Sequence, residues 1–187
     1  MKDTLNARVK HREEFRPFAP ACLYKRMSEY FELAEEAPFM LLIAQATELA
    51  RRQVSAVVHV DGTARVQSVT RSENLDFYQI LSAFESLTGI PIVLNTSFNV
   101  NGETIVEGAL DALESFGFMD IDYLAIGPYW VAKAENSSRF PNLTHDDYLE
   151  LRRRRYRDRK LGPLTELDIS HFDSAFFNIE SCSVATP

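Results

Sequence analysis

Apolar residues recur with a helical period in three parts of the chain. These segments cover residues 20–34, 75–89 and 105–118. The spacing of apolar positions by three and four predicts amphipathic helices that each bury one face. Gly89 ends the second segment, and glycine commonly follows the last helical residue.

Other apolar runs are too short for helices and predict strands. Buried strands are expected at 38–45, from residue 90 and at 121–133, where the last is a strand or a bent strand pair. Two β-rich runs at 54–60 and 63–69 flank Asp61-Gly62, which is a strong signal for a hairpin. Hairpin and strand–helix–strand elements together predict an α/β fold with a mixed sheet.

The polarity of the chain changes near residue 134. Residues 1–134 carry the helix and strand patterns of a compact domain, whereas 135–187 are typical of a linker, a charged helix and a polar tail. Thr144 is the expected N-cap of that helix, with Asp147 at the third helical position. The basic run at 152–160 favours a solvated helix, and the alternative is a contact with a polyanion or a partner protein.

Composition restricts the class of protein. Hydrophobic residues make up 45% of the 187 residues, so the chain can bury a substantial core. The formal charge of −7 argues against broad nucleic-acid binding, and the two cysteines suggest no disulfide framework. No apolar run is long enough for a membrane span, and the N-terminus lacks a secretory signal pattern. A cytoplasmic protein without membrane contact is expected.

The segment "VKHREEFRPFAP" at residues 9–20 combines cations with packing residues. Lys10, Arg12 and Arg16 lie among aromatic rings and prolines in a chain that is acidic as a whole. A solvated helix would disperse these charges, and a core segment would exclude them. A partly enclosed cationic binding site would require both kinds of residue.

Two further polar segments interrupt packable sequence. His59 and Arg65 flank the predicted hairpin turn in "HVDGTARVQ". Small polar residues follow a predicted buried strand in "NTSFNVNGE", namely Asn95, Thr96, Ser97 and Asn99. Ligands often bind beyond the carboxyl ends of strands in open α/β sheets, where amides and hydroxyls can hold phosphate oxygens. The cations of the other two segments would supply the positive charge.

Each of these residues also has a simpler interpretation. Asn and Ser after a strand are what a turn needs. Arg65 could pair across strands with an acidic neighbour, and His59 could be structural. Lys10 and Arg12 could be surface partners of Glu13 and Glu14. The residues taken singly leave these alternatives open.

Together, the three segments resemble the C-terminal half of the NodU-type O-carbamoyltransferases in order and spacing. The resemblance covers about residues 5–133. It implies a YrdC-like fold, with a twisted mixed β-sheet, flanking helices and a central cationic cavity. The K-x-R and S-x-N signature of YrdC-like proteins corresponds to Lys10-His11-Arg12 and Ser97-Phe98-Asn99.

The resemblance also implies an activity. This domain would bind ATP and carbamoyl phosphate and form carbamoyl-adenylate, with Mg²⁺ bridging the ATP phosphates and no metal site on the chain itself. The roles follow by resemblance. Lys10, Arg65 and Ser97 would be catalytic, and the substrate would be bound by Arg12, Arg16, His59, Asn95, Thr96 and Asn99. Transfer to an acceptor hydroxyl would require an N-terminal metal-binding domain, either acting in trans or lost by truncation.

Two other functions remain open. A non-catalytic module that binds nucleotide or carbamoyl phosphate could regulate a partner. Alternatively, the chain could be an RNA-binding relative, because some YrdC-like proteins work on RNA and residues 152–160 are basic. Ligand binding without chemistry would indicate the first, and RNA affinity with a steep salt dependence would indicate the second.

Overall fold

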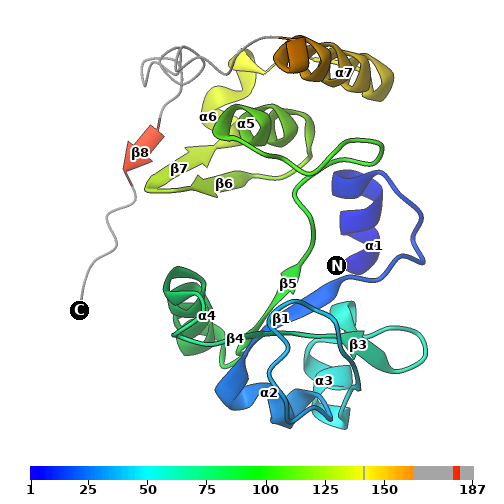
Figure 1. Cartoon of the computed structure of the whole chain (residues 1–187), viewed down its shortest axis with the longest axis vertical. Helices are drawn as coiled ribbons and strands as arrows, with labels where there is room; N and C mark the ends of the chain where they lie inside the picture. The colour runs from blue at the N-terminus through cyan, green and yellow to red at the C-terminus, as the bar shows by residue number, and fades with distance from the viewer. Residues whose placement is uncertain (141, 162–178, 182–187) are drawn as a thin grey trace. The chain divides into compact units, whose positions relative to one another are not determined.

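The structure of the chain, a computed structural model, describes residues 1–140, 142–161 and 179–181 (Figure 1). The chain divides into two units. The first contains Met1–Asn6 and Glu13–Ser97. The second contains Ala7–Arg12 and the described residues from Phe98 onward.

A three-stranded mixed sheet forms the centre of the first unit. Its middle strand β1 (Ala19–Leu23) runs parallel to β4 (Gln67–Val69) and antiparallel to β5 (Ile92–Asn95). A separate antiparallel pair consists of β2 (Ile43–Gln45) and β3 (Thr63–Arg65). The observed strands confirm an α/β fold with a mixed sheet.

All five residues of β1 are buried because helices cover both faces of the strand. On one face, Cys22 belongs to the same core cluster as Met27 of α2 (Tyr24–Tyr30). On the other face, Leu23 packs with Leu81 of α4 (Leu75–Thr88).

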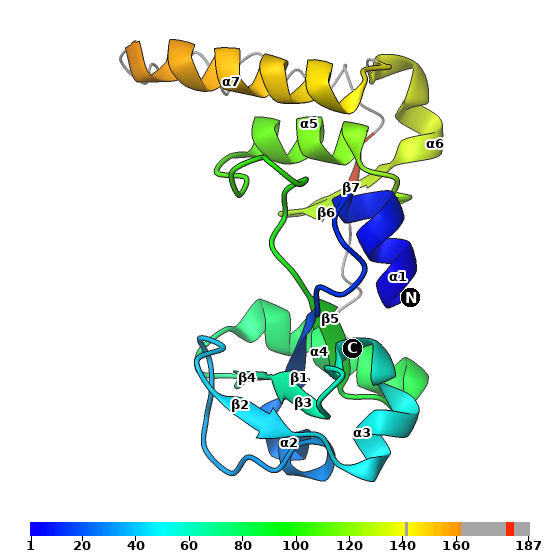
Figure 2. The same cartoon turned by 90° about the vertical axis from the view of Figure 1, so that its right-hand side faces the viewer.

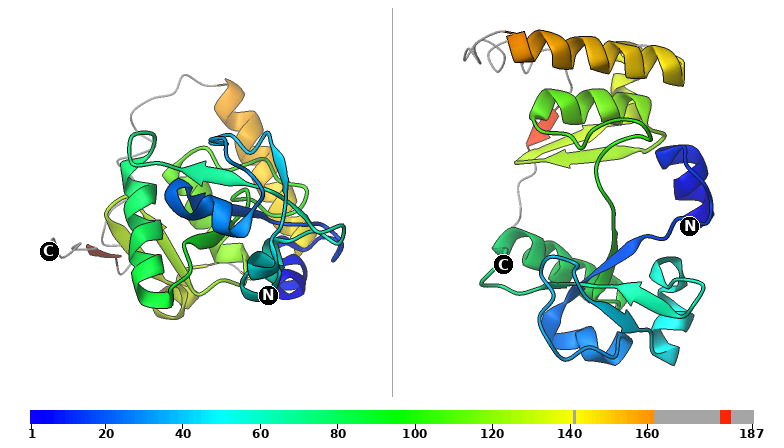
Figure 3. Two further views of the ribbon diagram at one scale, coloured as in Figure 1. Left: turned by 90° about the horizontal axis from the view of Figure 1, so that it is seen from below. Right: turned by 45° about the vertical axis from the view of Figure 1, so that its right-hand side comes forward.

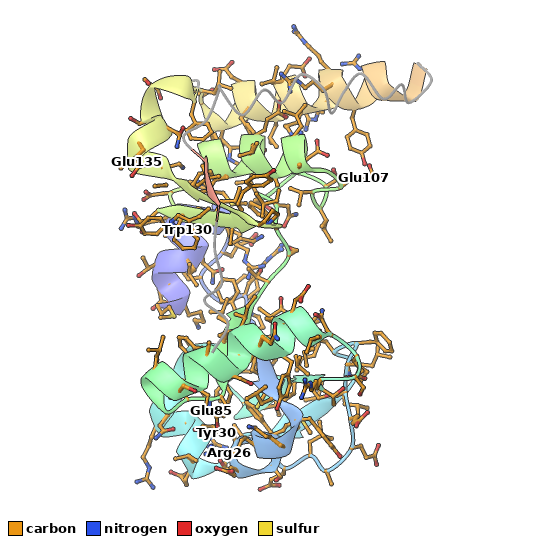
Figure 4. All side chains as sticks on the ribbon, turned by 90° about the vertical axis from the view of Figure 1, so that its left-hand side faces the viewer. Arg26, Tyr30, Glu85, Glu107, Trp130 and Glu135 are labelled. Carbon is orange, nitrogen blue, oxygen red and sulfur yellow. The ribbon has the colours of Figure 1, made fainter. Side chains whose placement is uncertain are left out.

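An ion pair joins these two helices at the surface. Arg26 of α2 donates to Glu85 of α4 at 2.5 Å, and both side chains are labelled in Figure 4. The first unit also contains the helix α3 (Glu48–Gln53), the 3₁₀ turn η2 (Ser55–Val57) and the short helix α1 (Lys2–Thr4).

The second unit is layered. Its antiparallel sheet has the order β6 (Tyr123–Ile126), β7 (Tyr129–Ala132) and β8 (Ile179–Ser181). Figure 2 shows α5 (Ala109–Phe118) between this sheet and α7 (His145–Leu161), and the right-hand view of Figure 3 agrees.

Apolar side chains hold these layers together. Leu113 and Phe116 of α5 share a core cluster with Leu124 and Val131 of the sheet. The shorter elements of this unit are α6 (Lys133–Asn136) and the 3₁₀ turn η3 (Ser137–Arg139). The π-helical segment η1 (Leu5–Lys10) begins in the first unit and continues into the second from Ala7.

Several predicted elements are confirmed. The helix predicted at 75–89 is α4, and Gly89 follows it with a left-handed φ of 76°. The predicted strand pair at 121–133 is the β6–β7 hairpin. Thr144 caps α7 as expected, because its Oγ1 accepts a hydrogen bond from the Asp147 backbone at 3.2 Å. Within the described residues, no helix is long and apolar enough to cross a membrane.

Other predictions were wrong. The segment predicted as one helix at 20–34 begins as the buried strand β1, and its helix starts only at Tyr24. The run at 38–45 is not a buried strand: Leu41 is 81% exposed, and only its last three residues form β2.

The predicted hairpin is only partly present. Gly62 makes the expected turn with a φ of 83°. The run before the turn is not its partner strand, since it contains the 3₁₀ turn Ser55–Val57. Instead, β3 pairs with β2. The predicted linker contains α6 and η3, and most of the predicted polar tail lies outside the described residues.

Candidate functional site

The residues of the predicted site are divided between the two units. The first unit holds Arg16, His59, Arg65, Asn95, Thr96 and Ser97, and the second holds Lys10, Arg12 and Asn99. The chain passes between units inside two of the three polar segments, after Arg12 and after Ser97. Convergence of all these residues on one cavity remains a prediction.

Lys10 and Asn99 form the closest contact among the predicted residues of the second unit. The ammonium of Lys10 donates to the backbone oxygen of Asn99 at 2.6 Å and to its Oδ1 at 2.8 Å. The backbone of Asn101 donates to the Lys10 carbonyl at 3.2 Å. The segments containing the K-x-R and S-x-N signatures are therefore joined by both side-chain and main-chain hydrogen bonds.

Lys10 is buried, with only 4% of its surface exposed. Burial is the main reason that its pKa falls to about 8, and the charge of Arg12 lowers it further, against the opposing effect of Glu103. The interpretation of Lys10 as a surface partner of Glu13 or Glu14 is wrong. A buried ammonium with a lowered pKa is typical of a functional site.

Glu103 organises the loop that carries Asn99, although sequence reasoning did not identify it. Its backbone oxygen accepts a hydrogen bond from Asn99 Nδ2 at 3.0 Å. Its Oε2 accepts one from the Val100 backbone, also at 3.0 Å. Glu103 is the last residue of "NTSFNVNGE", but the sequence pattern gives no sign that its side chain turns inward.

In the first unit, Asn95 lies at the end of β5 and is half-buried. Its Nδ2 donates to Gln67 Oε1 at 2.6 Å. Thr96 and Ser97 follow directly and are exposed. The structure therefore places small polar residues after this strand, as the sequence predicted.

Arg65 lies in β3 opposite Ile43 of β2, and its side chain is exposed. It forms no ion pair with any residue that the structure describes. Within those residues, the structure does not show the alternative in which Arg65 pairs across strands with an acidic neighbour, because the residue opposite it is Ile43.

Arg16 and His59 make local contacts. Arg16 Nε lies 2.9 Å from Glu13 Oε2 in an exposed ion pair, which contributes little stability. His59 Nδ1 lies 3.2 Å from Thr63 Oγ1, and the His59 backbone donates to the Thr63 carbonyl at 2.7 Å. These contacts give His59 a role in closing its turn.

Residues 1–133 match the protein family described as "Carbamoyltransferase C-terminus". This chain belongs to that family. The family-level resemblance predicted from the three polar segments is therefore confirmed, and the chain contains a carbamoyltransferase C-terminal domain.

Individual relatives support the same assignment. Nodulation protein NolO of Bradyrhizobium diazoefficiens is 44% identical over 135 residues, which cover 71% of this chain and 25% of NolO. The 3'-hydroxymethylcephem-O-carbamoyltransferase of Amycolatopsis lactamdurans is 37% identical over 137 residues, or 72% of this chain and 25% of that enzyme. This carbamoyltransferase domain thus spans about a quarter of the length of these relatives.

A relative of unassigned function matches a longer part of the chain. The Synechocystis protein sll1178 is 35% identical over 171 residues, which cover 81% of this chain and 28% of that protein. Residues 1–134 alone make up less than 81% of the chain, so the match must include residues beyond 134, where α7 lies. Part of the chain beyond the matched carbamoyltransferase domain is thus shared with at least one relative.

Helix α7 is packed along one side, contrary to the expectation of a solvated helix. Arg152 is only 6% exposed and Tyr148 only 2%. Arg152 Nε donates to Glu103 Oε1 at 2.7 Å, and its Nη1 donates to Asp111 and Glu114, both at 2.7 Å. Three carboxylates therefore surround one buried guanidinium.

Other arginines of the basic run are also paired. Arg155 contacts Glu114, and Arg154 Nε lies 3.0 Å from Glu150 Oε1. These pairs neutralise part of the charge that suggested a polyanion surface. They weaken the argument for RNA binding.

His11, the middle residue of the K-x-R signature, contacts α7. Its ring centroid lies 5.7 Å from that of Phe118 and 5.8 Å from that of His145, the first residue of α7. Burial and the nearby His145 lower the pKa of His11, with Asp120 acting in the opposite direction. Its φ of 49° lies in the left-handed region, which is uncommon for residues other than glycine.

Proposed function

We propose that this chain binds ATP and carbamoyl phosphate and forms carbamoyl-adenylate for transfer to an acceptor hydroxyl. Membership of the carbamoyltransferase C-terminal family supports this reaction class. The observation that carries the proposal is the buried Lys10, which is hydrogen-bonded to Asn99. One residue from each signature segment meets at that contact.

The proposed chemistry has two steps, namely hydrolysis of carbamoyl phosphate and transfer of the adenylyl group of ATP to carbamate. Water hydrolyses carbamoyl phosphate to carbamate and inorganic phosphate. A carbamate oxygen then forms a bond to the α-phosphorus of ATP while the bond to the β-phosphate oxygen breaks, releasing pyrophosphate. Mg²⁺ held by the ATP phosphates would offset their negative charge.

Fixed cations suit this chemistry because two polyanions must come close together. Lys10 provides a compact positive charge in a buried setting, where electrostatic interactions are stronger than in water. Arg12, Arg16 and Arg65 can grip phosphate oxygens with paired N–H groups. The proposal assigns binding of the small carbamoyl group to Ser97 and Asn99, with Asn95, Thr96 and His59 as further binding residues.

Transfer to the acceptor is assigned to the part of the protein that relatives carry beyond this domain. The chain spans only 25% of NolO and of the cephem carbamoyltransferase. We therefore propose an N-terminal metal-binding domain, on the same protein or in trans, as the partner for this second step.

The first half-reaction can be tested by exchange of labelled pyrophosphate into ATP in the presence of carbamoyl phosphate. The proposal predicts exchange that disappears in Lys10→Ala and Arg65→Ala. Lys25→Ala is the matched control, because Lys25 is an exposed lysine of α2 outside the proposed site. Absence of exchange with and without a supplied N-terminal domain, or full exchange in both site variants, would contradict the proposal.

A non-catalytic module is the second candidate, because the chain covers so little of its relatives. Such a module would bind ATP or carbamoyl phosphate and give no exchange. Isothermal titration calorimetry with ATP and with carbamoyl phosphate, combined with the exchange assay, distinguishes a binding module from an enzyme.

A further inference from the structure

Glu103 makes several of the hydrogen bonds that hold the loop from Asn99 to Glu103. Besides the contacts of its carbonyl and Oε2, the Glu103 backbone donates to the Val100 carbonyl at 3.2 Å. Gly102 takes a φ of 82° within the same turn. The Glu103 carboxylate therefore holds the residue next to Asn99, because its Oε2 accepts the hydrogen bond from the Val100 backbone.

Three donors converge on Glu103 Oε1. Ser115 Oγ lies at 2.9 Å, Tyr148 donates at 2.6 Å and Arg152 Nε donates at 2.7 Å. Ser115 comes from α5, whereas Tyr148 and Arg152 come from α7. Helix α7 thus supplies two of the three donors, including the only charged one.

The ion pair at the centre of this cluster is deeply buried. The side chains of Arg152 and Glu103 are 6% and 2% exposed. Removal of one partner from a buried pair leaves the other charge without compensation, and the surrounding structure must move or admit water. Loss of Arg152 would therefore release Glu103 and loosen the loop.

The chain of contacts continues to Lys10. Arg152 donates to the Glu103 carboxylate, and the Glu103 backbone oxygen accepts a hydrogen bond from Asn99 Nδ2. Asn99 in turn accepts two hydrogen bonds from the Lys10 ammonium. All four residues belong to the second unit. The family match ends at residue 133, so its far end lies outside the matched region.

We propose that Arg152 and Tyr148 of α7 are positioning residues that act through Glu103 to hold Asn99 against the Lys10 ammonium. Their importance for the reaction rests on the proposed carbamoyl-adenylate function. The positioning itself can be measured without any substrate.

The readout is the pKa of Lys10, which is measured by NMR titration of protein labelled with ¹³C at lysine. The Lys10 signal is assigned by its absence from the spectrum of Lys10→Arg. Arg12 and Glu103 are the charged groups that act on Lys10 besides burial. A loosened loop would hydrate Lys10, and an unpaired Glu103 would favour the ammonium. Both effects raise the pKa from about 8 towards 10.5.

Arg152→Met should raise the pKa of Lys10 by about one unit or more. Tyr148→Phe should raise it by less, because it removes one hydroxyl and keeps the ring that stacks on Phe118 at 4.4 Å. Arg154→Met, the same change at an exposed position of α7, should leave it unchanged. Unfolding curves establish which variants are folded.

An unchanged Lys10 pKa in folded Arg152→Met overturns the proposal. If that variant does not fold, Tyr148→Phe decides in the same way. The exchange assay is then run on the same proteins, and a misplaced site is expected to lose up to about 100-fold in exchange rate. A raised Lys10 pKa in Arg152→Met, together with no exchange by the wild-type chain, would support the positioning and reject the proposed function. The failure of one proposal is therefore distinguishable from the failure of the other.

Discussion

Lys10 and Asn99 are 89 positions apart in sequence, yet the Lys10 ammonium donates to both the carbonyl and the side-chain oxygen of Asn99. The contact buries the ammonium and lowers its pKa to about 8. Lys10 therefore changes charge close to neutral pH, and this property leads to the first prediction.

Affinity for ATP should fall as the pH rises above 8. The protonated form of Lys10 attracts phosphate, and the neutral amine that dominates above pH 8 does not. Linkage sets the limit at about a tenfold loss per pH unit. Isothermal titration calorimetry between pH 7 and pH 9.5 measures the affinity for ATP. Lys10→Met is expected to bind ATP weakly, with an affinity that does not fall in this way as the pH rises. A wild-type affinity that is constant over the range would contradict the role of Lys10.

Arg152→Met should destabilise the second unit by about 3–5 kcal/mol, because it leaves the buried carboxylates Glu103 and Asp111 without their cation. Arg154 lies on the same helix but is exposed, so Arg154→Met should lower the free energy of unfolding by less than about 1 kcal/mol. Urea unfolding of both variants gives the comparison. Equal losses would mean that burial does not distinguish these two ion pairs.

His11 should make the fold less stable at mildly acidic pH. Burial and His145 lower its folded pKa below the ordinary value of 6.5. The unfolded chain then takes up the proton more readily, so the stability contributed above pH 6.5 is lost as the pH falls through the folded pKa.

His11→Asn is the suitable variant, because asparagine tolerates a positive φ and does not titrate. The free energy of unfolding should drop less between pH 7.5 and pH 5 in this variant than in the wild type. A drop of the same size in both proteins would assign the acid sensitivity to other groups.

Leu81→Ala should cost about 2–5 kcal/mol, since Leu81 is fully buried between α4 and the mixed sheet. Leu87 lies on the same helix but is 86% exposed. Leu87→Ala should therefore change stability by no more than about 0.5 kcal/mol. A comparable loss in both variants, measured by thermal unfolding, would argue against the described packing of α4.

The sequence predicted best those elements whose signals are local. Helix α4 has its period, its Asn74 cap and its Gly89 end within one stretch of chain. Thr144 and Asp147 likewise identify the start of α7 within four residues. Short-range hydrogen bonds decide such features, and the residues that form them are neighbours in sequence.

Burial that depends on distant partners was predicted less well. Leu41 belongs to an apolar run yet is 81% exposed, and β1 was included in a helix although the parallel neighbour β4 makes it a strand. An apolar run alone does not indicate which element, if any, will cover it.

The candidate site shows the same division. The three polar segments identified the family and named Lys10 and Asn99 as site residues, but not the hydrogen bonds between them. The support from Glu103 and Arg152 was missed, since 49 positions separate the two residues and a run of arginines is usually solvated. Only the packing of α7 shows which arginine of the run turns inward.

The central claim is the formation of carbamoyl-adenylate, and direct detection of that product tests it best. The chain would be incubated with ATP, Mg²⁺ and ¹³C-labelled carbamoyl phosphate, with and without the N-terminal part of a relative, and the nucleotides analysed by mass spectrometry. The account predicts an adenylate carrying the ¹³C label from the wild type and none from Lys10→Ala. Absence of the labelled adenylate from the wild type under both conditions would contradict it.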